Sequence, residues 1–158
     1  MNISFRHLVA IGALAGFAGL AAAVDTTPAS PAAADKLAPA RQAIAAKNWT
    51  LAIEELKKVG DTGSADWNNL MGYTHRKART PDFAAAERYY DEALRIDPKH
   101  RASLEYSGEL YLMMGNVAKA EQRLATLDKV CLLPCAEYTE LKKSIAAYKA
   151  NGRYVSNY

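Results

Sequence analysis

The chain has 158 residues, of which 50% are hydrophobic and 23% are charged. Its formal net charge of +3 is small, and this near balance argues against nucleic acid, and against a membrane surface, as the main partner. The sequence contains neither a glycine-rich phosphate loop nor a G-x-S-x-G nucleophile motif, so no catalytic residue, cofactor or metal site is assigned and the protein is not expected to be an enzyme.

Residues 1–23 have the pattern of a secretory signal peptide. Arg6 provides a basic start, Leu8–Leu20 is apolar and uncharged, and Ala21–Ala23 offers a cleavage site of the A-x-A type. An uncleaved anchor is the other interpretation, because the stretch from Leu8 to Val24 reaches the lower end of the roughly 17 to 25 residues that span a bilayer. Cleavage predicts a periplasmic or secreted protein without stable membrane insertion.

The mature chain is expected to have three parts. Residues 24–34 are rich in Pro, Ala, Ser and Thr and predict a disordered linker, since they contain nothing large to bury. Residues 35–150 predict one helical domain, and residues 151–158 a short tail that is frayed unless its tyrosines pack back. Loss of residues 1–23 removes one basic residue and no acidic residue, which lowers the net charge to +2.

Apolar residues recur at helical spacing throughout the expected domain, and turn residues separate the segments. The pattern predicts helices at 36–47, 49–59, 65–78, 81–96, 99–114, 117–130 and 136–150. Thr80 is the expected N-cap of the fourth helix, Pro81 its first residue, and Pro98 its stop. Gly72 and Gly108 are expected where two helices approach closely.

Part of this pattern occurs three times along the chain, at a constant interval of 34 residues. The apolar positions Phe83, Ala86, Tyr90 and Ala93 have counterparts one interval earlier and one interval later, which are Trp49, Ala52, Leu56 and Val59, then Val117, Ala120, Leu124 and Leu127. A period of this length is typical of a helical repeat array, in which neighbouring units bury one another's faces.

The repeat also carries the marks of a known family. The pattern Ala86-x3-Tyr90 followed by Pro98, and the pattern Leu104-x2-Ser107-Gly108-x2-Tyr111, resemble the tetratricopeptide repeat over about residues 34–130. The resemblance implies an all-α, right-handed solenoid of three helix-turn-helix units, and residues 136–150 fit a terminal capping helix. The chain departs from the family in its first-helix landmarks Ala40, Gly72 and Gly108, which are unequally spaced.

The resemblance also implies a concave groove that is lined by the first helix of each unit. The expected groove residues for a bound peptide are Asn69, Tyr73, Arg76, Lys77, Glu105, Glu109, Leu112 and Met113. Tyr73, Leu112 and Met113 would anchor apolar side chains, and the opposed charges would set the peptide's orientation. Arg76 and Lys77 can equally be ordinary solvated charges, and Glu105 and Glu109 argue against capture of a terminal carboxylate.

The cysteines Cys131 and Cys135 are the only candidates for chemistry. An even pair in an exported chain predicts a disulfide, and a thiol redox or soft-metal site is the alternative. The spacing is not C-x-x-C, and no histidine flanks the pair. The sequence therefore favours a periplasmic scaffold or assembly factor that binds a protein, with thiol chemistry as the second hypothesis and self-association as the third.

Overall fold

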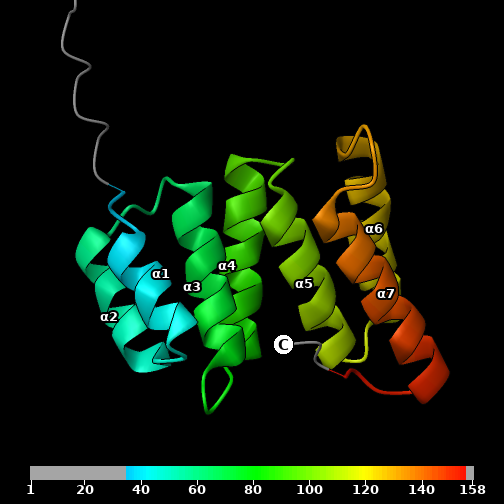
Figure 1. The fold of residues 1–158 in the computed structure, drawn as a ribbon, viewed down its shortest axis with the longest axis horizontal. Coiled ribbons are helices and arrows are strands. Elements are labelled where there is room, and N and C mark those ends of the chain that lie inside the picture. Colours follow the sequence, from blue (N-terminus) through cyan, green and yellow to red (C-terminus); the bar gives the residue numbers. More distant parts are fainter. Residues whose placement is uncertain (1–34, 156–158) are drawn as a thin grey trace, which may run out of the picture. The chain divides into compact units, whose positions relative to one another are not determined.

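The structure is a computed structural model that describes residues 35–155. Within these residues the chain is helical and has no strand: the helices are α1 (Ala38–Ala45), α2 (Trp49–Val59), α3 (Ala65–Lys77), α4 (Phe83–Ile96), α5 (Arg101–Met113), α6 (Val117–Val130) and α7 (Ala136–Asn151). The predicted all-α fold is confirmed (Figure 1). The expected signal peptide and linker lie outside the described residues. None of the helices in the described part has the length and hydropathy of a membrane span.

Polar side chains fix where five of the helices begin. In each case the side chain before the helix accepts a hydrogen bond from a backbone N–H three residues later, which satisfies one of the free donors of the first turn. These caps are Asn48, Ser64, Asp82, His100 and Asn116. The prediction for α4 was therefore wrong by two residues: Asp82 is the cap instead of Thr80, and Pro81 precedes the helix. The Asp82 N–H donates to the carbonyl oxygen of His75 at 3.1 Å, which ties this turn to α3.

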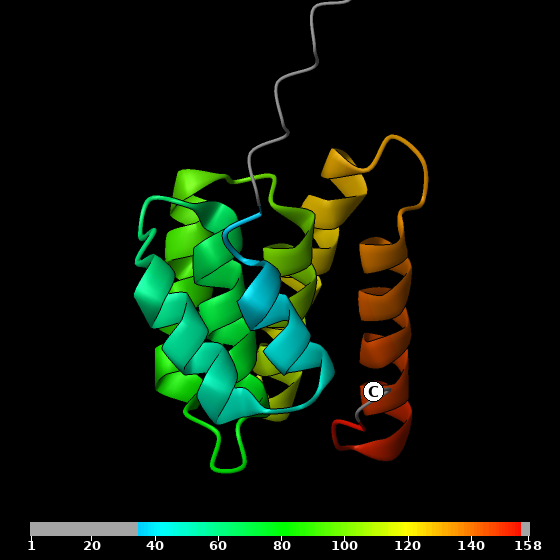
Figure 2. The same ribbon diagram turned by 60° about the vertical axis from the view of Figure 1, so that its left-hand side comes forward.

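Polar contacts between equivalent helices of successive units show that the repeat is structural. Their partners are 32 to 34 residues apart, and they join α3 to the start of α5 and α4 to α6. The pairs are Asp66 with His100, Asn69 with Ser103, Glu87 with Lys119 and Asp91 with Arg123. Figures 1 and 2 show the helix pairs α1–α2, α3–α4 and α5–α6 following one another, with α7 beside α5 and α6. Each unit thus packs against its sequence neighbours, as expected for a helical solenoid.

The two predicted close approaches are both present. A Cβ atom built on Gly72 would lie 2.7 Å from the ring of Tyr90 in α4, and one on Gly108 would lie 2.6 Å from Leu141 in α7. Tyr90 and Leu141 are both completely buried. The missing side chains therefore create the space in which α4 and α7 pack.

We expect Gly72→Ala to destabilise the protein by about 1–2 kcal/mol. Overpacking against the rigid Tyr90 ring costs about 1–3 kcal/mol, and the better helix propensity of alanine returns about 1 kcal/mol. Urea denaturation followed by circular dichroism measures the change. A variant at least as stable as the wild type would show that α4 shifts freely and would contradict a tight α3–α4 contact.

Candidate functional site

A buried ion pair joins α3 to α5. Arg76 of α3 donates from Nη1 to Glu109 Oε2 of α5 at 2.7 Å, and the side chains are 1% and 0% exposed. Ser144 of α7 donates to the other carboxylate oxygen of Glu109 at 3.5 Å. Burial opposes the charge of Arg76, but the surrounding Tyr90 and Glu109 hold its pKa above the ordinary value. One charged network therefore connects α3, α5 and α7.

Aromatic rings surround the guanidinium of Arg76. Its central carbon lies 5.4 Å from the ring centroid of Tyr73 and 5.5 Å from that of Tyr106. The Tyr73 and Tyr106 centroids are 4.9 Å apart, and Trp49 lies 6.2 Å from Tyr73. Burial raises the pKa of Tyr106 to about 12, so its hydroxyl stays neutral at physiological pH. The result is a row of three rings, Trp49, Tyr73 and Tyr106, beside the ion pair.

Several polar atoms in this centre have no hydrogen-bond partner among the described residues. They are Arg76 Nε and Nη2 and the hydroxyl of Tyr90, which is fully buried. The charge of Arg76 still acts on Tyr90, where it partly offsets the rise in pKa caused by burial. Buried donors without acceptors are uncommon in folded proteins and call for an explanation at each site. Arg76 also lines a pocket, whereas the Tyr90 hydroxyl lies behind it in the core.

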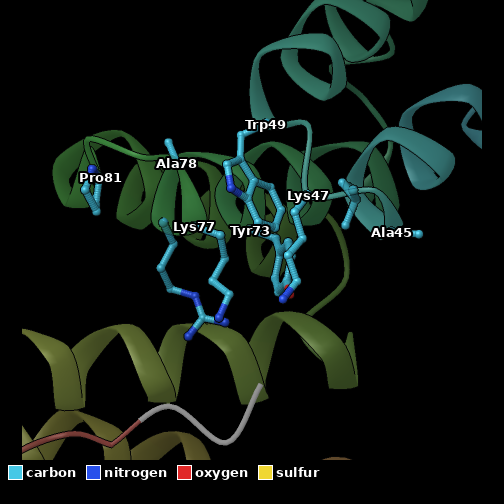
Figure 3. A pocket seen from close by; sticks show the side chains of 9 residues that line it. Ala45, Lys47, Trp49, Tyr73, Lys77, Ala78 and Pro81 are labelled. Atoms are coloured by element: carbon cyan, nitrogen blue, oxygen red, sulfur yellow. The ribbon is translucent and has the colours of Figure 1, made fainter.

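The pocket lies between the turn after α1, the start of α2 and the end of α3. Its volume is about 520 Å³, and its described lining consists of Ile44, Ala45, Lys47, Trp49, Tyr73, Arg76, Lys77, Ala78 and Pro81. Figure 3 shows Trp49, Tyr73, Lys47 and Lys77 around one space. The described lining has three cations and no carboxylate. Burial lowers the pKa of Lys77, and the adjacent Arg76 lowers it further. The pocket therefore favours an apolar or aromatic group with a negative charge beside it.

Lys47 occupies a backbone position that normally suits glycine. Its φ is +54°, and the bonds from Lys47 N to the Ile44 oxygen and from Asn48 N to the Ala43 oxygen form a Schellman motif at the end of α1. The end of α5 has the same motif, and there the equivalent residue is Gly115, at φ +76°. A left-handed conformation costs a side-chain-bearing residue about 1–2 kcal/mol. The structure thus keeps a strained lysine at the rim of the pocket.

The structure places the eight predicted groove residues in two groups. Tyr73, Lys77 and Met113 are half-buried, and Tyr73 and Lys77 line the pocket. The other five are buried: Asn69, Arg76, Glu105, Glu109 and Leu112. Arg76 and Glu109 were expected to face a bound peptide but bind each other, and Asn69 accepts a hydrogen bond from Ser103 at 3.1 Å. Peptide contact by the eight residues stays a prediction.

The expectation for Leu112 differs most from the structure. It was placed on the open groove as an apolar anchor, but only 1% of it is exposed. It belongs to the core cluster of α5, α6 and α7 that also contains Leu127 and Leu141. The reason is tertiary: α7 packs on α5 where a further repeat would otherwise stand, and it covers that end of the concave face.

Sequence reasoning also missed residues of the pocket. Trp49 was expected on the inner face of α2, and it reaches the pocket edge beside Tyr73. Lys47 and Tyr106 were not singled out at all. A signal for Lys47 was present, because it stands two repeats before Gly115 in the sequence. A lysine at the glycine position of a repeated turn is a local conflict of the kind that functional sites retain.

The cysteine pair lies in the turn between α6 and α7. The sulfur atoms of Cys131 and Cys135 are within bonding distance, and their Cα atoms are 5.8 Å apart, in the range that a disulfide requires. Between them Leu132 and Leu133 are 99% and 80% exposed. No group of three or more His, Cys, Asp or Glu residues within residues 35–155 is arranged to hold a metal ion. The geometry is compatible with the expected disulfide.

Comparison with known proteins adds one finding. Residues 81–130 match a family model that is described as Tetratricopeptide repeat, and this range contains α4, α5 and α6. No curated protein and no solved structure gives a significant match to the chain. The matched range coincides with the best-preserved copies of the repeated pattern.

Proposed function

Since this chain is a tetratricopeptide repeat protein, we propose that it binds an extended segment of a partner protein in the aromatic and cationic pocket at the end of α3. The family is a protein–protein interaction module and is generally non-catalytic. Repeat stacks present a concave surface, on which recognition needs a few apolar anchors and well-placed charges. The arrangement of Trp49, Tyr73 and Lys47 around one cavity is the observation that carries this proposal.

The chemistry of the pocket specifies the segment. An aromatic or aliphatic side chain would pack between Trp49 and Tyr73, whose rings already meet edge to face. An acidic side chain next to it would lie against Lys47 and Lys77, where no described lining residue carries a negative charge. The partner therefore offers an acidic residue beside an apolar one in an extended stretch.

The proposed setting is the periplasm, where the protein would act as a scaffold or assembly factor. The signal-like pattern of residues 1–23 supports this location, and so does the pairing of the only two cysteines, because disulfides persist in oxidising compartments. In that role the disulfide would close the turn that positions α7. Thiol chemistry is not needed for the binding function.

Lys47→Gly provides a test in which stability and binding move in opposite directions. The substitution relieves the left-handed strain, so we expect the protein to gain about 0.5–1 kcal/mol of stability, after allowing for the greater unfolded-state freedom of glycine. It also removes a pocket cation, so recovery of the partner from a periplasmic extract should fall roughly tenfold, the equivalent of about 1.4 kcal/mol. Quantitative mass spectrometry of the captured proteins measures the recovery.

Lys99→Gly is the matched control. Lys99 is an exposed lysine in the turn between α4 and α5, at the other end of the helices from the pocket (Figure 1). This variant loses the same charge and should capture the partner as the wild type does. Equal capture by wild type, Lys47→Gly and Tyr73→Ala would place the binding surface elsewhere and overturn the proposal.

A further inference from the structure

The segment after α7 turns back toward the concave side. Gly152 ends α7 at φ +68°, a conformation that glycine adopts without strain, and its N–H donates to the oxygen of Tyr148 at 2.8 Å. Figure 1 shows the chain running from this point back toward the end of α5. Arg153 and Val155 are exposed, whereas Tyr154 between them is half-buried. A single side chain thus attaches the tail.

Tyr154 reaches the Arg76–Glu109 ion pair, of which Arg76 lines the pocket. Its ring packs on the core cluster that includes Leu112 and Leu141. Its hydroxyl lies beside Glu109 and Arg76, and burial, followed by the charge of Glu109, raises its pKa to about 12. Arg76 also lines the pocket described above. The tail therefore stands directly next to the surface on which the partner segment would lie.

The contact is incompletely satisfied. The Tyr154 hydroxyl is buried beside Glu109 and Arg76 but makes no hydrogen bond of good geometry with either, and Arg76 Nε and Nη2 are likewise without a well-placed acceptor. Burial of the ring favours the docked tail, and the loss of hydration at these polar atoms opposes it. Because these two effects oppose each other, another segment can replace Tyr154 at this surface.

We propose that the surface beside the Arg76–Glu109 pair is a docking site for an extended, tyrosine-bearing segment, and that the chain's own residues 153–155 occupy it at rest. Arg76, Glu109 and Ser144 supply polar groups beside the apolar cluster that contains Leu112 and Leu141, and this combination matches a tyrosine side chain better than an aliphatic one. The inference rests on the proposed function, because it describes how access to the same concave side is regulated. A partner segment must displace Tyr154 before it can use the full surface.

The tail sequence itself is the probe. A fluorescently labelled peptide of residues 151–158 is titrated with the full-length mature chain and with its Tyr154→Ala variant, and anisotropy is recorded. An attached tail competes at a millimolar effective concentration, so the peptide should bind Tyr154→Ala at least tenfold more tightly than the wild type. The same peptide with alanine in place of its tyrosine at position 154 should bind neither.

Two further variants control for folding. Tyr138→Ala removes another half-buried tyrosine from the same core cluster, and its peptide affinity should equal that of the wild type. Gly152→Ala removes no core side chain but strains the left-handed turn, so it should increase peptide affinity several-fold in the same direction as Tyr154→Ala. Circular dichroism confirms equal helicity for every chain that is compared.

The outcomes separate the two proposals. Peptide binding that is equal in wild type and Tyr154→Ala, or absent from Tyr154→Ala and Gly152→Ala at full helicity, would overturn the resting tail contact. A partner captured equally by wild type and Tyr154→Ala would also overturn it, while the proposed binding function would stand. Tail-peptide binding without any partner that depends on Lys47 would leave the tail contact standing and remove the proposed function.

Discussion

Replacing Glu109 with leucine should destabilise the protein by about 3–5 kcal/mol, the usual effect of leaving one member of a buried ion pair without its partner. Arg76 would keep its charge inside the protein, because the pKa of a guanidinium is too high for it to lose the proton. Its only described hydrogen-bond partner is Glu109, at 2.7 Å. Urea denaturation with circular dichroism gives the change in the free energy of unfolding.

The double variant Arg76→Met/Glu109→Leu tests the cause of that loss. Buried ion pairs are often replaced by apolar residues of similar volume at no net cost, and here two donors of Arg76 already lack acceptors. We expect the double variant to recover most of the stability that either single variant loses, apart from the contacts of the guanidinium with Tyr73 and Tyr106. Losses that simply add would contradict a coupled pair.

Reversal of the charge at Arg76 is therefore not a clean test of partner binding. Arg76→Glu would bury two carboxylates next to each other, so weaker partner capture by an Arg76→Glu/Lys77→Glu variant would report unfolding as well as binding. Lys47 avoids this problem, because it is exposed and its replacement by glycine is expected to stabilise the fold.

Leu141→Ala should cost about 2–5 kcal/mol, as for other fully buried leucines. Leu141 is 0% exposed, and with Ser144 and Ile145 it is one of three buried residues of α7. Much of the attachment of this helix therefore depends on Leu141. Denaturation gives the overall loss, and hydrogen exchange should show α7 amides losing protection before those of α3 and α4.

Gly108 supplies the matched test of this contact. An added Cβ would lie 2.6 Å from Leu141 in the wild type, so Gly108→Ala should be destabilising there. In the Leu141→Ala background the clashing methyl groups are gone, and the same change should be neutral or stabilising, since alanine then fills space and favours the helix. An equal cost in both backgrounds would show that α5 and α7 do not pack through this pair.

The repeat architecture was predictable from sequence because it depends on local and periodic information. The apolar spacing of Trp49–Val59 and Val117–Val130 sets the period, and Asn48 and Asn116 supply caps, so both helices have the predicted bounds. Gly72 and Gly108 were recognised for the same reason, since a residue without a side chain inside an amphipathic helix implies a close neighbour. The candidate groove residues came from the resemblance to the tetratricopeptide repeat, which implies that the first helix of each unit lines the groove.

Whether those residues are accessible was decided only by the tertiary structure. Helical spacing places Glu109 and Leu112 on one side of α5, and the family resemblance assigns Arg76 of α3 to the same groove, but neither shows what lies opposite. Arg76 and Glu109 are 33 residues apart in the sequence, and they are buried because α3 and α5 bring them together; Tyr154 of the tail lies beside them. Leu112 is buried because α7 covers it. Burial is a property of the neighbours that the fold brings together, and no pattern within a single helix contains that information.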